Sequence, residues 1–317
     1  MKRWTAGLLA LLVPALLAGC SGATPTATTA PEAAVAQATP SPSAPTCGNA
    51  VASLRPSGAL PAAGQMPAGS YMRVIQDRGR LVAGVSQDTL LFGFLNPFTG
   101  QIEGFDIDVL HQIAQAIFGD PNKIEYRAIT TADRIPKILD DSVDIVGRTF
   151  TINCARRAQV DFSSVYFAAG QRVLVRKDST AKGIQDLGGK KVCATKGSTS
   201  IDHITQAASK PIPYPLADFT DCLVAFQNSE VDAISTDDAI LAGLAKQDPY
   251  AKLVGDRFSD EPYGLGISLK HPEFTRFVNG VLDQMRANGT WANLYGKWLV
   301  PSLSNAVPAP PAAAYKD

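Results

Sequence analysis

The stretch GRTFTINCARR, residues 147–157, gathers hydroxyl and guanidinium groups at the end of an apolar run. Thr149 and Thr151 fall on one face of an extended strand, because strand side chains alternate. Arg156 offers a planar fork of donors that matches a carboxylate, and Arg148 adds a second cation. A buried strand end needs none of these groups. The pattern therefore predicts a pocket for a small anion.

Strands and helices alternate on either side of this stretch. Apolar runs predict strands at residues 81–85, 123–130 and 143–150. Between the first two strands, apolar residues recur at helical spacing up to Gly119. Thr131 is the expected N-cap of a helix before the third strand. This order implies a parallel sheet flanked by helices, with polar groups gathered at the carboxyl ends of its strands.

The same order repeats in the second half of the chain, beginning with a strand expected at residues 170–177. The sequence thus predicts an α/β protein with two lobes of about a hundred residues each. Two chain crossings, near residues 169–172 and 261–264, should join the lobes. Gly170 and Gly264 lie there and would absorb backbone rotation.

The ends of the chain differ in composition from its middle. Residues 1–19 are predicted to be a secretory signal, because a basic start precedes an apolar stretch too short to span a membrane. The residues LAGC match the bacterial lipoprotein cleavage box, a resemblance that implies cleavage before Cys20 and lipid on its sulfur. An ordinary signal peptide is the alternative. Residues 20–70 and 301–317, rich in Pro and Ala, predict a tether and a flexible tail.

Charge and cysteine content narrow the class of protein. The 29 Lys and Arg residues balance 29 Asp and Glu residues, and no basic stripe points to nucleic acid. Besides Cys20 there are four cysteines, an even number that in an exported chain predicts two disulfides. Three pairings are open, and we favour Cys193–Cys222, which lie in one stretch of the fold, with Cys47–Cys154. No C-x-x-C spacing occurs and the three histidines are scattered, so neither a metal nor a cofactor is expected.

Six motifs follow one another along the chain: GFDIDVLHQIAQAIFG, RTFTINCARRAQVDFSSVYF, KKVCATKGSTSIDH, VDAISTDDAILAGLA, EPYGLGISLK and NGTWANLYGKWL. Their order and spacing resemble the bacterial extracellular solute-binding proteins of family 3, which bind polar amino acids for ABC importers. The likeness covers residues 74–299 and is closest to glutamate/aspartate-binding proteins and actinobacterial glutamine-binding lipoproteins. It implies a two-lobed, type II periplasmic-binding-protein-like fold, each lobe a mixed, mostly parallel sheet with flanking helices. Lobe 1 would comprise residues 71–169 and 264–300, and lobe 2 residues 170–263.

The resemblance assigns the two charged groups of an α-amino acid, and the chemistry of the residues agrees. A carboxylate and an ammonium leave water at low cost only when each is paired. The residues expected at the α-carboxylate are Arg156, Thr151, Ser198 and Thr199. The last two open a helix, whose free N–H groups favour an anion. The amine is expected at Asp237, which can also cap the following helix, and at the carbonyl of Thr149.

The residues expected to meet the ligand side chain are Arg134, Arg148, Lys196 and Thr131. Arg134 matches the residue that holds the distal carboxylate in the glutamate/aspartate branch, but that branch has a further arginine where this chain has Ser86. Arg148 or Lys196 would replace it, or the ligand would be an amide. Thr89, in place of an aromatic residue, argues against cationic ligands. Phe92 and Ser86 are candidate walls of the pocket.

These expectations imply a monomeric lipoprotein, anchored to the outer face of the cell membrane. It would bind an acidic amino acid or its amide (glutamate, aspartate, glutamine or asparagine) and present it to an ABC permease. Sensing through a membrane regulator is the alternative, because both roles use the same closed surface. An enzyme is the third hypothesis, since the fold also hosts dehydratases of cyclic amino acids, although no nucleophile–base pair stands out in the sequence.

Overall fold

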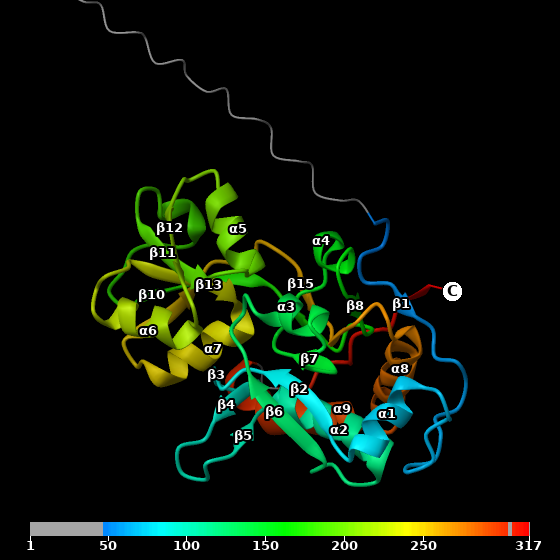
Figure 1. Ribbon diagram of the computed structural model, residues 1–317. Coiled ribbons are helices and arrows are strands. Elements are labelled where there is room, and N and C mark those ends of the chain that lie inside the picture. Colours follow the sequence, from blue (N-terminus) through cyan, green and yellow to red (C-terminus); the bar gives the residue numbers. More distant parts are fainter. Residues whose placement is uncertain (1–46, 304–305, 317) are drawn as a thin grey trace, which may run out of the picture. The chain divides into compact units, whose positions relative to one another are not determined.

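The computed structural model describes residues 47–303 and 306–316. Its two largest sheets have five strands each (Figure 1). We call the part built on the first sheet lobe 1 and the part built on the second lobe 2. The signal segment and Cys20 lie outside the described residues. Within those residues, every helix is too short or too polar to span a bilayer.

Lobe 1 contains a sheet of β2 (Leu81–Val85), β6 (Ile124–Ala128), β7 (Ile145–Gly147), β8 (Asp161–Phe162) and β16 (Gly266–Ile267). The spatial order is β6-β2-β7-β16-β8, with β2 parallel to β6 and β7, and β16 antiparallel to β7 and β8. A smaller sheet beside it comprises β3 (Asp88–Thr89), β4 (Gly93–Leu95) and β5 (Ile102–Glu103). The helices of lobe 1 are α1 (Tyr71–Arg78), α2 (Phe105–Phe118), α3 (Arg134–Leu139), α4 (Cys154–Arg157), α8 (Pro272–Ala287), α9 (Thr290–Trp298) and α10 (Val300–Leu303).

The apolar patterns explain the core of lobe 1. All five residues of β2 are buried, as a parallel strand covered on both faces requires. Helix α2 buries Ile107, Leu110 and Ile113 completely, and burial of each such side chain contributes about 1.5–3 kcal/mol. The helix ends at Gly119, whose φ of 75° lies in the left-handed region that glycine adopts without strain. Helix α2 and strand β2 therefore form where they were predicted.

Lobe 2 contains β10 (Gln171–Arg176), β11 (Lys191–Thr195), β12 (Ile212–Leu216), β13 (Ala233–Asp237) and β14 (Ala251–Val254). The spatial order is β12-β11-β13-β10-β14, with β11 parallel to β12 and β13, and β10 antiparallel to β13 and β14. Its helices are η1 (Ile184–Asp186), α5 (Thr199–Gln206), α6 (Phe219–Gln227) and α7 (Asp238–Gln247). A disulfide joins Cys193 in β11 to Cys222 in α6 within the core.

Two short antiparallel strands connect the lobes: β9 (Phe167–Ala169) leads into β10, and β15 (Glu261–Tyr263) leads into β16. Gly170 and Gly264 occupy these connections, but neither adopts a left-handed φ. A Cβ on Gly170 would lie 2.5 Å from Arg257 Cδ, and one on Gly264 would lie 2.7 Å from Ile152 Cδ1. In this arrangement, close packing is the reason that both positions require glycine.

The chain ends differ from the tether and tail expected for them. A disulfide joins Cys47 to Cys154 at the start of α4. Beyond it, β1 (Ser53–Leu54) pairs in parallel with β17 (Tyr315–Lys316). Asn279 of α8 fixes β1 by donating to Ser53 Oγ and Leu54 O, each at 2.7 Å. Residues 47–70 and 306–316 therefore pack on lobe 1, because specific polar contacts compensate for their weak apolar pattern.

The N-cap prediction for Thr131 is wrong. Helix α3 begins at Arg134 after Asp133, whose carboxylate accepts from Thr130 N at 3.2 Å and Thr130 Oγ1 at 2.7 Å. The Thr131 hydroxyl instead accepts from Arg148 Nη1 at 2.5 Å. A buried guanidinium thus competes for the oxygen that would otherwise cap the helix.

Candidate ligand-binding site

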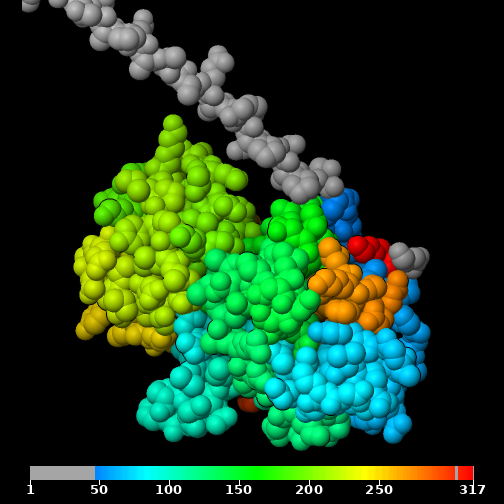
Figure 2. All heavy atoms as spheres, in the orientation of Figure 1, coloured from blue at the N-terminus to red at the C-terminus, as the bar shows by residue number. Residues whose placement is uncertain are grey.

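The two lobes lie side by side (Figures 1 and 2). A small polar cavity between them is lined by residues at strand ends and helix N-termini of both. Its lining residues are Thr131, Arg134, Thr149, Thr151, Ser198, Thr199, Ser200, Phe219, Thr236, Asp237 and Ile240. Seven of these are residues that the sequence placed around a ligand. The cavity holds about 10 Å³, which is far less than an amino acid occupies, so a ligand fits only if the residues around the cavity rearrange.

Arg156 lies on the lobe 1 side of the junction and is 8% exposed. Asn153 caps the short helix α4 by accepting from Arg156 N at 2.9 Å. The guanidinium stacks over Phe150 at 5.1 Å and donates to Thr151 O at 2.6 Å and Gly197 O at 3.1 Å. Burial lowers the pKa of Arg156 to about 10, so the side chain remains charged at neutral pH.

Arg134 lies over the same aromatic ring, 4.3 Å from its centre. Its guanidinium donates to the carbonyls of Thr131 (2.9 Å), Arg148 (3.2 Å), Thr149 (3.1 Å) and Gly197 (3.3 Å). Burial, and next the charge of Arg156, lower the pKa of Arg134 well below its usual value. Both arginines therefore share one acceptor, the Gly197 carbonyl, at a point where a carboxylate would be stabilised by both.

Thr149 adopts a strained backbone that presents its polar groups to the junction. Its φ is 38°, a left-handed value that a β-branched residue rarely adopts. Asp106 accepts from Thr149 N at 2.9 Å and holds this conformation. Thr151, two residues on, pairs with Tyr263 in an isolated β-bridge. These contacts turn both threonines toward the cavity that they line.

Asp237 ends β13 on the lobe 2 side and is 4% exposed. Its Oδ2 accepts from Tyr263 Oη at 2.5 Å, whereas Oδ1 is buried with no hydrogen-bond partner among the described residues. Burial, and next the charge of Glu261, raise the pKa of Asp237 to about 8. An unpartnered buried carboxylate oxygen at the cavity wall is the acceptor that an ammonium group requires.

Ser198 and Thr199 open helix α5 at the cavity. Ser198 is the N-cap, because its Oγ accepts from Ile201 N at 3.2 Å and donates to Thr195 O at 2.7 Å. The Thr199 hydroxyl donates to Glu261 Oε2 at 2.7 Å. Both residues line the cavity, but their hydroxyls have protein partners in this arrangement, so the free backbone N–H groups of the first helical turn are the available donors.

Five of the predicted residues do not line the cavity: Arg148, Arg156, Lys196, Ser86 and Phe92. Arg156 instead donates to the carbonyl of Thr151, which does line it. Arg148 is buried but ion-paired within the protein, whereas the Lys196 side chain is exposed. The Ser86 hydroxyl hydrogen-bonds Asp88 and Thr89. Phe92 packs edge-on against Phe105, Phe167 and Tyr263 in the core of lobe 1.

Three residues that shape the site are not among those predicted from the sequence. Tyr263 donates to Asp237, Glu261 accepts from Thr199, and Asp106 positions Thr149. Tyr263 and Glu261 belong to the motif EPYGLGISLK, on which part of the family resemblance rests. Membership of this motif could have marked both as candidate site residues. Their contacts with Asp237 and Thr199 could not be predicted, because they depend on how β15 crosses between the lobes.

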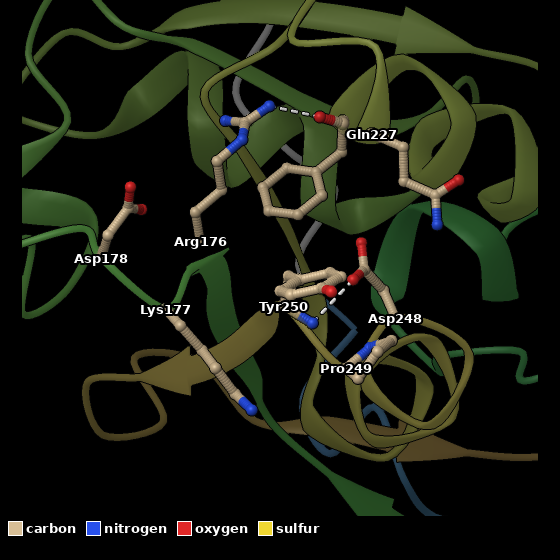
Figure 3. Close-up of a pocket in the computed structure, with 8 residues that line it drawn as sticks. Arg176, Lys177, Asp178, Gln227, Asp248, Pro249 and Tyr250 are labelled. Atoms are coloured by element: carbon tan, nitrogen blue, oxygen red, sulfur yellow. Dashed lines mark hydrogen bonds between the residues drawn. The ribbon is translucent and has the colours of Figure 1, made fainter.

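A second hollow, of about 550 Å³, lies on lobe 2 and contains none of the predicted residues (Figure 3). Arg176 lies 4.5 Å from the centre of the Phe226 ring and donates to Phe226 O. Tyr250 N donates to Asp248 Oδ1 at 2.8 Å. The polar groups of Arg176 and Asp248 are thus directed at neighbouring chain segments. Among the described residues, no group of three or more His, Cys, Asp or Glu side chains is placed to hold a metal ion.

Comparison with known proteins shows the family to which the chain belongs. Residues 81–301 match the model of the bacterial extracellular solute-binding proteins, family 3. The chain belongs to this family. This solute-binding protein is 39% identical to the ABC transporter glutamine-binding protein GlnH of Bacillus subtilis, over 72% of its own length and 84% of the relative. It is 43% identical to a glutamine-binding protein of Geobacillus stearothermophilus, over 61% of its own length and 74% of the relative.

A solved structure shares the two-lobed fold of this solute-binding protein. It is the cysteine-binding protein of Campylobacter jejuni, with a TM-score of 0.72 and 25% identity. The match covers 76% of this chain and 97% of the other. The fold expected from the sequence, α/β with two sheets of mostly parallel strands and flanking helices, is confirmed.

Proposed function

We propose that this solute-binding protein captures an amino acid between its lobes and delivers it to an ABC permease. The observation that carries the proposal is that a buried cation, Arg156, which donates to the cavity-lining residue Thr151, lies at the same interlobe junction as the half-unpartnered carboxyl group of Asp237. An α-amino acid presents the complementary charges. Its carboxylate would replace the Gly197 carbonyl between the two arginines, and its ammonium would meet Asp237 Oδ1.

Charge balance favours a ligand with a neutral side chain. Arg134 and Arg156 are opposed by Asp237 and Glu261, and all four are 8% exposed or less. The charge of Glu261 is the largest effect that opposes the lowering of the Arg156 pKa by burial. Once Asp237 has lost its proton to meet an ammonium group, two cations and two anions leave the site neutral, and a zwitterion keeps it so. We therefore propose glutamine as the preferred ligand, with the acidic amino acids as weaker competitors; two relatives at about 40% identity are named as glutamine-binding.

A thermal-shift screen of the twenty amino acids tests this function. A ligand present at a hundred times its Kd stabilises the folded protein by about 2.7 kcal/mol. Glutamine is expected to raise the unfolding temperature most, and isothermal titration calorimetry then gives its affinity. A protein that no amino acid stabilises would contradict the proposal. A ligand that is converted to product during the titration would instead support the enzyme hypothesis.

Replacing Glu261 with glutamine is expected to shift selectivity toward glutamate by roughly tenfold, measured as the ratio of the two dissociation constants. The change removes one negative charge that opposes an acidic side chain, yet keeps an oxygen that accepts from Thr199. Glu230→Gln is the matched control, because Glu230 is exposed and accepts from Asn228 far from the cavity. An unchanged ratio in Glu261→Gln would contradict the charge-balance argument.

We also propose that the protein is held outside the cell by lipid on Cys20. The support is the sequence LAGC after an apolar stretch, together with membership of an extracellular family. Mass spectrometry of the mature N-terminus would show whether Cys20 carries the lipid. Pull-down of the anchored protein with membrane partners separates delivery to a permease from signalling through a regulator.

A further inference from the structure

A second set of contacts joins the lobes outside the cavity, and it centres on Arg148. The side chain of Arg148 follows β7 in lobe 1 and is 1% exposed. Its Nη2 donates to Asp218 Oδ1 in lobe 2 at 2.9 Å and lies 3.4 Å from Asp88 Oδ1 in lobe 1. Nε donates to Ile129 O at 2.7 Å, and Nη1 to Thr131 Oγ1 at 2.5 Å. The guanidinium is thus fully engaged by the protein.

Asp88 makes a second contact between the lobes, in which a side chain of lobe 1 binds the backbone of lobe 2. Its Oδ2 accepts from Phe219 N at 3.0 Å and from Thr220 N at 3.4 Å, in the first turn of helix α6. Those N–H groups have no partner within a helix, and the positive end of the helix dipole favours an anion there. A carboxylate of lobe 1 therefore binds the helix N-terminus of lobe 2, beside the residue that caps that helix, Asp218.

The three side chains depend on one another across the junction. Arg148 carries one positive charge between two carboxylates, and one of those carboxylates belongs to each lobe. If the lobes separate, Arg148 loses Asp218, and Asp88 loses the N–H groups of α6. Separation would therefore exchange charge-assisted hydrogen bonds within the protein for hydrogen bonds to water, and the closed arrangement keeps the bonds that join the lobes.

We propose that Arg148, Asp88 and Asp218 form an interlobe latch, in which Arg148 is a positioning residue that stabilises the closed protein without touching the ligand. The inference rests on the proposed function, in which closure retains the amino acid. The latch also contacts the wall of the cavity, through the hydrogen bond from Arg148 to Thr131. Because Arg148 donates to Thr131 Oγ1, the Thr131 hydroxyl must direct its own hydrogen elsewhere, and Thr131 lines the cavity.

The variant Asp218→Asn tests the latch with little effect on folding. Asparagine caps helices as well as aspartate does, so the local role at α6 is kept while the cross-lobe charge is lost. We expect the dissociation rate of glutamine to rise roughly tenfold, whereas the association rate changes less than twofold, because opening limits release. Asp218→Glu should restore slow release. Asp221→Asn is the matched control, since Asp221 lies on the same helix and accepts from Asp218 N within lobe 2.

A double-mutant cycle with Asp88→Asn measures whether the two carboxylates act together. If they form one latch, the two changes combined should accelerate release less than the product of their separate effects. Release rates that match Asp221→Asn in both single variants would overturn the inference.

Hydrogen–deuterium exchange of the full chain gives a readout that needs no ligand. In Asp88→Ala, the amides of Phe219 and Thr220 should exchange at least several-fold faster than in the wild type, while those of the first turn of α5 are unchanged. Unchanged exchange at Phe219 and Thr220 would overturn the latch. If no amino acid binds the wild-type protein, the proposed function fails, and the exchange rates still decide whether the latch exists.

Discussion

Replacing Arg156 with alanine is expected to weaken amino-acid binding by roughly thirtyfold to several thousandfold, corresponding to about 2–5 kcal/mol. The ligand carboxylate would lose its bidentate partner in a site that is almost closed to solvent. Arg156→Lys keeps the charge but lacks the planar fork, so we expect it to recover only part of the affinity. Titration calorimetry with glutamine measures both variants.

A control must separate loss of the ligand contact from loss of a packed guanidinium. Arg176→Ala serves this purpose, because Arg176 also lies over an aromatic ring and donates to backbone carbonyls, but in lobe 2 and away from the cavity (Figure 3). We expect it to lower the unfolding temperature without changing the dissociation constant. Wild-type affinity in Arg156→Ala, with the protein folded, would remove Arg156 from the site.

The second large effect is expected at Asp237, where asparagine should weaken binding by at least a hundredfold. The change keeps the shape of the side chain and removes the charge that the ligand ammonium requires. Asp238→Asn is the matched control at the adjacent position, because Asp238 pairs with Arg257 outside the cavity. Equal affinities for the Asp237→Asn and wild-type proteins would contradict the assignment of the amine to Asp237.

Because of Asp237, affinity for the ligand should rise with pH, whereas the stability of the folded protein should fall with pH. With a pKa near 8, the carboxyl group of the unliganded protein holds a proton at neutral pH and must lose it to bind an ammonium. Affinity is therefore expected to fall up to tenfold for each pH unit below about 8. The raised pKa makes the folded protein bind the proton more tightly than the unfolded chain, so this stabilisation is present at low pH and is lost as the pH rises through about 8. Calorimetric titrations and thermal melts between about pH 6 and pH 9 check both directions, and neither dependence should persist in Asp237→Asn.

Secondary structure in this protein follows closely from local pattern. Strand β2 has the predicted bounds, and α2 ends at the predicted Gly119. A strand buried on both faces is a continuous apolar run, and a helix with a left-handed end is followed by glycine, so both patterns can be recognised in a sequence. The strands β1 and β17 have no such recognisable pattern. Each is two residues long, and their pairing depends on Asn279, more than 220 residues from β1 along the chain.

Most residues predicted at the α-amino-acid groups line the cavity, whereas only two of the four predicted at the ligand side chain do. Asp237 ends β13, as expected for a polar residue at a strand end. Thr149 and Thr151 follow β7, which ends at Gly147, and the φ of 38° at Thr149 differs from the extended strand predicted there. Arg148 and Lys196 are single cations on irregular backbone, and no periodicity fixes the direction of such side chains. Arg148 turned to Asp88 and Asp218, because burial of a guanidinium requires charged partners wherever they lie along the chain.

The disulfide Cys47–Cys154 and the strand pair β1–β17 both attach the chain ends to lobe 1. A pulling force applied through the N-terminal segment would therefore be borne by lobe 1 alone and would not pass through β9 and β15 to lobe 2. In an anchored protein, lobe 2 would then be able to move on those strands without carrying the load. A tethered protein of this construction would open and close as freely under tension as it does in solution.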